Sequence, residues 1–90
     1  MLYSIKEAIY GEVSFPADLS GIVQSIDKEK TKKGDIHIYI MKDAETADLL
    51  PIKCWESYDV LGKKVIAHDV NTHDYKGDVV FVAKKILGGQ

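Results

Sequence analysis

The sequence predicts a mainly β fold, in which five short strands close into a small barrel or sandwich behind a short N-terminal helix. Glycine, asparagine and aspartate separate its apolar segments, as they do at turns. The strongest strand signal is the alternation in segment 35–41, with Ile36, Ile38 and Ile40 on one face and His37, Tyr39 and Met41 on the other. Closing such a sheet would remove exposed edges that invite association.

The same criteria place each element in order. A helix is expected over 3–9, because Ser4 is a suitable N-cap and Glu7 completes a capping box. The expected strands are 19–26, 35–41, 50–55, 63–68 and 78–86. Turns or loops are expected at 27–34, 42–49 and 69–77, and one helical turn at 56–61. The predicted core consists of Val23, Ile36, Ile38, Ile40, Ile52, Val65 and Phe81.

Length and composition bound the organisation of the chain. Its 90 residues predict one domain, 1–90, with a helical extension at 1–17 and the barrel at 19–86. No apolar run approaches the roughly 20 residues that a membrane span needs, and no signal-peptide pattern is present. We therefore expect a cytoplasmic protein with no membrane partner. Cys54, the single cysteine, is expected in the core.

The charge pattern limits what the chain can recognise. The formal net charge is −2, and all 12 basic residues are lysines. Arginine is the usual bidentate reader of guanine edges, so its absence argues against sequence-specific recognition of nucleic acid. Any nucleic-acid binding would depend on phosphate contacts and stacking.

The order of these features resembles the OB-fold, a five-stranded Greek-key barrel. A glycine lies inside the first strand, an aspartate follows the long second strand, and an aromatic residue ends the third. A glycine precedes the fourth strand, and a Tyr-x-Gly turn leads into the fifth. The resemblance covers roughly residues 4–86 and rests on segments 5–8, 19–23, 34–43, 51–55, 61–65 and 75–81. Many nucleic-acid-binding domains of bacteria and archaea have this pattern.

The resemblance implies a binding face on the outer side of the second and third strands. Lysines of the first turn would contact phosphates, and aromatic side chains would stack on bases. The turn before the fifth strand would border the same groove. The candidate nucleic-acid-binding residues are Lys28, Lys30, Lys32, Lys33, His37, Tyr39, Lys53, Trp55, Tyr75 and Lys76.

Two functions remain open. The first is a non-catalytic module that binds single-stranded DNA or RNA with little sequence preference. The alternative is an interaction or structural domain that binds a protein partner or a second copy of itself. A groove of lysines and aromatic residues would favour the first, and an apolar patch ringed by acids the second. No catalytic triad and no cofactor are expected, because no Ser-His-Asp set is evident in the sequence. No metal site is expected either, because the spacing of the histidines at 68 and 73 matches no zinc pattern.

Trp55→Ala provides a test of the nucleic-acid hypothesis. Alternation from Ile52 through Cys54 directs Trp55 outward. Its loss is expected to weaken oligonucleotide binding by about 1–3 kcal/mol, the range for a stacking aromatic residue. The free energy of unfolding should fall by less than the roughly 3–5 kcal/mol lost with a buried tryptophan. Fluorescence titration and urea denaturation measure the two effects, and a large stability loss without a binding loss would contradict the hypothesis.

Overall fold

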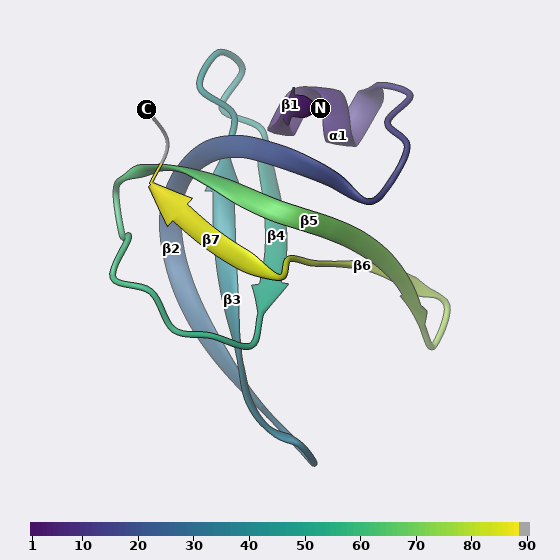
Figure 1. Cartoon of the computed structure of the whole chain (residues 1–90), viewed down its shortest axis with the longest axis vertical. Helices are drawn as coiled ribbons and strands as arrows, with labels where there is room; N and C mark the ends of the chain where they lie inside the picture. Colours follow the sequence, from purple (N-terminus) through teal and green to yellow (C-terminus); the bar gives the residue numbers. More distant parts are fainter. Residues whose placement is uncertain (89–90) are drawn as a thin grey trace.

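The chain folds as one mixed sheet with a single short helix, as the computed structural model describes it for residues 1–88 (Figure 1). Strand residues predominate, so the prediction of a mainly β fold is confirmed. The elements are β1 (Leu2–Ser4), α1 (Ile5–Tyr10), β2 (Ala17–Thr31), β3 (Gly34–Lys42), β4 (Leu49–Cys54), β5 (Lys64–Tyr75), β6 (Asp78–Val82) and β7 (Lys85–Gly88).

The sheet closes on itself in part. Its strand order is β1-β2-β3-β4-β6-β5-β7, and β2 also pairs with β5. The pairings β2–β3–β4–β6–β5–β2 therefore form a partial ring. Most of these pairings are antiparallel, but β4 and β6 are parallel and share only two residue pairs, Ile52 with Phe81 and Lys53 with Val82. This contact is the shortest pairing of the ring.

The helix α1 forms where the sequence predicts it. The hydroxyl of Ser4 accepts a hydrogen bond from the Glu7 amide, and the Glu7 carboxylate accepts one from the Ser4 amide. This reciprocal capping box satisfies two backbone donors that the first turn would otherwise leave free. Ile5 is the buried residue of the helix and packs into the core, so α1 lies against the sheet.

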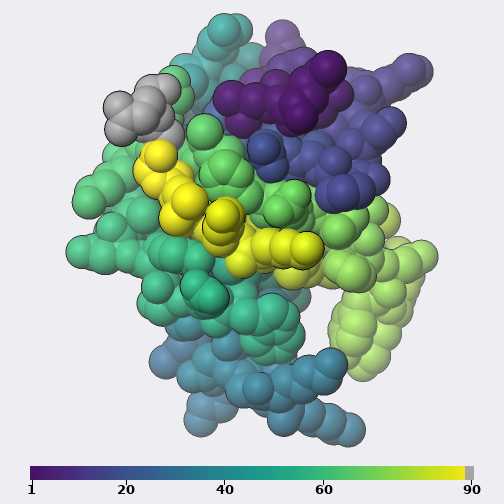
Figure 2. Space-filling view, viewed as in Figure 1, coloured from purple at the N-terminus to yellow at the C-terminus, as the bar shows by residue number. Residues whose placement is uncertain are grey.

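Two hairpins project from the ring, because most residues of the segments that we expected to be turns belong to strands instead. The segment 27–34 continues β2 and β3 up to a turn at Lys32 and Lys33, and 69–77 continues β5 up to a turn at Lys76 and Gly77. These turns need only two residues each, and positive φ values at Lys76 and Gly77 suit a tight hairpin. Figure 2 shows open space between the β2–β3 hairpin, in blue at the bottom, and the β5–β6 hairpin, in light green at the right.

The predicted orientation of β3 is wrong from Ile38 to Met41. Tyr39 and Met41 are fully buried in the core, whereas Ile38 and Ile40 lie on the outer face and are half-buried. The register explains the inversion, because Met41 lies opposite Val23 on β2 and Leu50 on β4, and both of those are buried. Apolar residues occupy both faces of this strand, so alternation alone does not tell which face is inside.

The other core predictions have mixed outcomes. Val23, Ile52 and Val65 are in the core as predicted. Ile36 is buried but lies outside the core cluster, and Phe81 is half-buried and packs edge-on against Phe15.

Two predicted elements also change, and one element is added. The expected fifth strand is interrupted between β6 and β7, the expected helical turn at 56–61 is irregular, and β1 is an additional strand beside β2. The β6–β7 interruption follows a change of neighbour, because the Ala83 amide donates to Lys53 on β4 and the Lys84 amide to His68 on β5.

Gly21→Ala is expected to destabilise the fold, because Gly21 lies where α1 crosses β2. An added Cβ would stand 2.8 Å from Ile5 Cγ1 and 3.0 Å from the Lys42 carbonyl oxygen. Overpacking of this kind costs about 1–3 kcal/mol in the free energy of unfolding. Gly88→Ala is the control, because an added Cβ there meets nothing within 4 Å. Equal unfolding midpoints of the two variants in urea would contradict the close packing.

Candidate ligand-binding groove

An apolar groove of about 430 Å³ lies between the two hairpins. Its floor is the outer face of β3, and its sides come from β4 and β6. The β2 strand adds one carboxylate, that of Asp27. The lining residues are Asp27, Ile38, Ile40, Leu50, Pro51, Lys53, Val79, Val80 and Phe81. Apolar side chains thus dominate a concave surface, which is the usual character of a binding site.

The groove exists because β4 and β6 separate. Their ladder ends at Ile52 and Phe81, and the preceding residue of β4 is Pro51. Proline has no N–H to donate, so it cannot extend a ladder and is found at edges of sheets. Beyond this point β6 follows β5 into the hairpin and leaves β4. Ile38 and Ile40, on the outer face of β3, are half-buried and line this opening.

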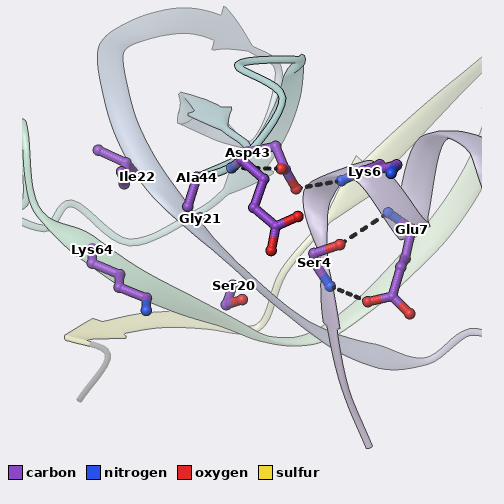
Figure 3. Close-up of a pocket in the computed structure, with 10 residues that line it drawn as sticks. Ser4, Lys6, Glu7, Ser20, Gly21, Ile22, Asp43, Ala44 and Lys64 are labelled. Atoms are coloured by element: carbon purple, nitrogen blue, oxygen red, sulfur yellow. Dashed lines mark hydrogen bonds between the residues drawn. The ribbon is translucent and has the colours of Figure 1, made fainter.

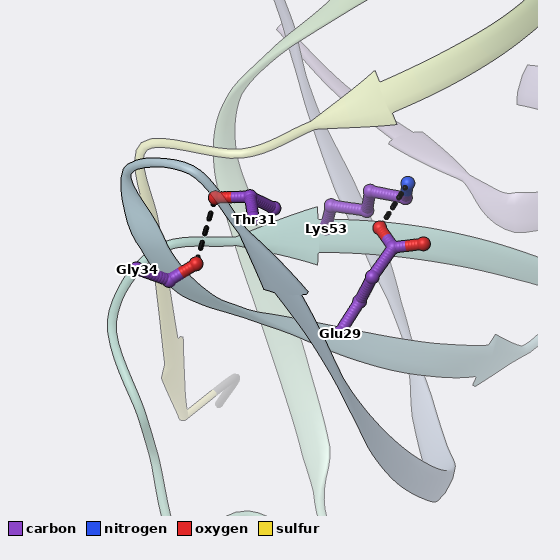
Figure 4. A network of polar contacts seen from close by, with 4 residues as sticks. All are labelled: Glu29, Thr31, Gly34 and Lys53. Carbon is purple, nitrogen blue, oxygen red and sulfur yellow. Dashed lines mark hydrogen bonds and ion pairs between the residues drawn. The ribbon is translucent and has the colours of Figure 1, made fainter.

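The one lysine of the groove is neutralised within the molecule. Lys53 Nζ lies 3.1 Å from Glu29 Oε1, so the ammonium is both hydrogen-bonded and ion-paired (Figure 4). The Lys53 side chain is 25% exposed and that of Glu29 52% exposed. Such a half-exposed pair contributes little to stability, but it reduces the attraction of Lys53 for a ligand phosphate.

The structure places the predicted lysines on hairpins rather than in the groove, except for Lys53. Lys28, Lys30, Lys32 and Lys33 are exposed on the β2–β3 hairpin. Lys28 Nζ lies 3.7 Å from an oxygen of Asp35, with both side chains largely exposed. At the tip, the Thr31 hydroxyl donates to the Gly34 carbonyl oxygen (Figure 4). The same hydroxyl accepts from the Lys33 amide.

The lysine at the other tip is Lys76, on the β5–β6 hairpin. Its ammonium lies 5.3 Å from the centre of the Tyr75 ring. This distance permits a cation–π contact between the two predicted site residues.

Tyr39 is not available for stacking, which corrects the prediction that it lines the binding face. Its ring is fully buried, its hydroxyl donates to the Glu56 carbonyl oxygen at 2.9 Å, and it accepts from the Tyr58 amide at 2.9 Å. Burial raises the pKa of the Tyr39 hydroxyl, against the lowering effect of the Tyr58 amide. The hydroxyl therefore fixes the irregular segment after β4 to the core.

The remaining aromatic and histidine predictions divide between the two faces. His37 lies on the same face of β3 as Tyr39, opposite Cys54 of β4, so it does not join Lys53 on the outer face as predicted. Trp55 follows β4 on the same side as Lys53 and is 46% exposed, and Tyr75 is 62% exposed at its hairpin. Neither Trp55 nor Tyr75 lines the groove.

Sequence reasoning missed most of the groove. It assigned Ile38 and Ile40 to the core and gave no role to Pro51, Val79 or Val80. The proline inside an expected strand was the one available signal, because proline marks an edge or the end of a ladder.

A second cavity, of about 440 Å³, lies beside the helix (Figure 3). Its buried carboxylate, Asp43, is fully engaged: Oδ1 accepts from the Lys6 amide at 2.8 Å, and Oδ2 from the Glu45 and Thr46 amides at 2.9 and 3.0 Å. These bonds, that from Lys6 above all, lower the pKa of Asp43 although burial opposes them. Asp43 therefore ties α1 to the β3–β4 loop and is not free to hold a ligand.

Comparisons with known proteins identify no relative: no family model, curated protein or solved structure matches this chain. Within residues 1–88, no cluster of three or more histidine, cysteine, aspartate or glutamate side chains could hold a metal ion. The six-residue α1 is the helix of this range, and it is too short to cross a membrane.

Asp43→Asn is expected to destabilise the protein by about 1–3 kcal/mol at neutral pH, because a carboxylate with three amide donors is replaced by a group that presents its own N–H₂. The folded-state pKa lies below the unfolded one, so the ionised Asp43 contributes stability above about pH 4 and loses it as pH falls through the folded-state pKa. Urea denaturation at about pH 7 and about pH 3 should show the difference from wild type shrinking in acid.

The control for this experiment is Asp59→Asn, at an exposed carboxylate. Its unfolding midpoint should follow wild type at both pH values. A pH-independent difference between the Asp43 variant and wild type would contradict the assigned role.

Proposed function

We propose that this chain is a non-catalytic binding module built on an OB-type barrel, and that its groove holds an extended segment of another protein. The ring order β2–β3–β4–β6–β5–β2 supports the barrel, because it is five-stranded and joins its third and fifth strands in parallel. OB-type domains are partly open Greek-key barrels, which agrees with the short contact between β4 and β6. The ring as a whole carries this part of the proposal.

The position of the groove supports a binding role. OB-type domains bind ligands on the face of their second and third strands, between the loops that join strands one to two and four to five. In this chain those strands are β3 and β4, and those loops are the tips of the two projecting hairpins. The groove lies on the outer face of β3 and between these hairpins.

The chemistry of the groove favours a polypeptide. This single observation carries the proposal: an apolar floor of Ile38 and Ile40 whose one lysine, Lys53, is already paired with Glu29. Asp27 adds a negative charge to the lining. A polyanion would meet carboxylates here, whereas apolar side chains of an extended segment would be removed from water.

Single-stranded nucleic acid, bound with low sequence specificity, is the second candidate. The exposed lysines at the tip of the β2–β3 hairpin favour it, because Lys30, Lys32 and Lys33 belong to no ion pair among residues 1–88. Trp55 offers a half-exposed ring near the end of β4. Phosphates would then contact the hairpin, with steep loss of affinity at higher salt.

Ile40→Thr distinguishes a groove ligand from a hairpin ligand. Threonine is also β-branched but replaces apolar surface in the groove, so binding of an apolar strand peptide should weaken by about 1 kcal/mol, or roughly fivefold. Fluorescence anisotropy would measure a labelled peptide in which valine alternates with lysine and threonine. The same titration would use an oligothymidine of about 15 nucleotides, since OB folds cover roughly 4–16.

The matched control is Leu87→Thr, at a half-exposed position on β7 that does not line the groove. It should leave peptide affinity unchanged. Tighter binding of oligothymidine than of peptide, lost steeply with salt and unaffected by Ile40→Thr, would contradict the proposal in favour of the second candidate.

A further inference from the structure

The groove runs along the edge of β6 rather than over one of its faces. Val79, Val80 and Phe81 are consecutive, and all three line it. Successive side chains of a strand point to opposite faces, so a surface that touches three in a row touches the strand's edge. Leu50 and Pro51 give the same indication for β4. The floor on β3 differs, because Ile38 and Ile40 share one face.

The backbone of Val79 faces this groove. Tyr75 and Asp78 flank the two-residue turn, and such flanking residues form a hydrogen-bonded pair. Pairs alternate along an antiparallel ladder, so Val79 and Asp74 form a pair whose N–H and C=O groups point away from each other. Ala83 lies four residues after Val79, so the backbone groups of both residues point to the same side of the strand. The Ala83 amide donates to the Lys53 carbonyl oxygen at 2.8 Å, so this side faces β4.

Pro51 leaves the Val79 backbone without a strand partner on that side. The parallel ladder from Ile52 and Phe81 would next join residues 51 and 80 of the two strands. Among the strand pairings of residues 1–88, Val79 pairs with Asp74 alone. Residue 51 contributes no donor, because it is proline. An unpaired N–H and C=O beside an apolar floor is the arrangement that accepts an added strand.

The charges around the opening select the kind of strand. Asp27 lines the groove, and Asp74 and Asp78 lie on the hairpin beside Val79. None of these carboxylates belongs to an ion pair among the described residues. Lys76 is the one basic residue between the latter two. The other exposed lysines of the two hairpins lie on the opposite, β2–β3 hairpin, so the excess of acid is confined to the β6 side of the opening. A segment with lysine or arginine among its apolar residues would complement the carboxylates on this side.

We propose that an extended, basic and apolar peptide segment adds as a strand to the free edge of β6, in the opening between β6 and β4. The proposal rests on the protein-binding function proposed above and specifies its mode. Main-chain hydrogen bonds to Val79 hold the segment, apolar side chains on one of its faces cover Ile38 and Ile40, and its basic side chains approach the carboxylates.

The first test uses the wild-type chain and the labelled valine–lysine–threonine peptide. Binding should slow hydrogen exchange at the Val79 amide, measured by NMR. The same peptide with alternate backbone amides N-methylated keeps its side chains but loses the edge donors, and should bind at least roughly tenfold more weakly. A peptide with glutamate in place of lysine should also bind more weakly, because it would face the acidic rim.

The second test removes the edge from the protein. Val79→Pro deletes the outward N–H, and Thr72→Pro is its control, because Thr72 occupies the same kind of pair with its backbone toward the opposite edge of the hairpin. Val79→Pro should lose at least roughly tenfold in peptide affinity and Thr72→Pro should not. If Val79→Pro does not fold, the affinities of the methylated and unmethylated peptides for the wild-type protein decide whether strand addition occurs.

The outcomes separate the two proposals. Equal binding of the methylated and unmethylated peptides, with no slowing of exchange at Val79, would overturn strand addition and leave a protein-binding groove. Failure of every peptide to bind would overturn both proposals, and so would displacement of the peptide by oligothymidine at equal concentration. Concentration-dependent dimerisation that protects Val79 without peptide would replace the peptide by a second copy of the chain.

Discussion

The ring of strands closes through the short backbone contact between β4 and β6, and the groove depends on how short this contact is. Contact between β4 and β6 is limited to two residue pairs, and Pro51 prevents its extension toward the start of β4. A full ladder would satisfy both edges, but it would also close the opening between β4 and β6. The truncated ladder preserves closure, since the amide of Ala83 still donates to Lys53. The ladder therefore ends at the residue that has no N–H to donate, and the ring is open on that side.

Two backbone irregularities direct the hairpins away from the ring. In β2 the register shifts between Val23 and Ser25, where pairing with β5 ends and pairing with β3 continues. In β5, Asp69 has φ 52° and stands between the part paired with β7 and the part paired with β6. Bulges bend strands and increase their twist. The two hairpins consequently diverge, and their charged side chains are solvated on both faces.

The sequence predicted what depends on local chemistry. The Ser4 cap, the strand over 35–41 and the exposed Trp55 all agree with the structure. The inner face of β3 could not be predicted, because both faces are apolar and the choice depends on partners distant in sequence. Tyr39 enters the core because Glu56 and Tyr58 satisfy its hydroxyl there. The groove was missed for the same reason: its floor consists of isoleucines that the pattern assigned to the interior.

An open edge beside apolar side chains is a hazard, because it invites pairing with other chains. The acidic residues at the β5–β6 hairpin limit this hazard. Asp74 and Asp78 flank Val79 in the hairpin, so a second copy of the same chain would bring like charges together. A basic segment would meet the opposite charge at the same place. The carboxylates would therefore disfavour self-association and favour one class of partner, and both effects follow from their position beside an edge that Pro51 keeps open.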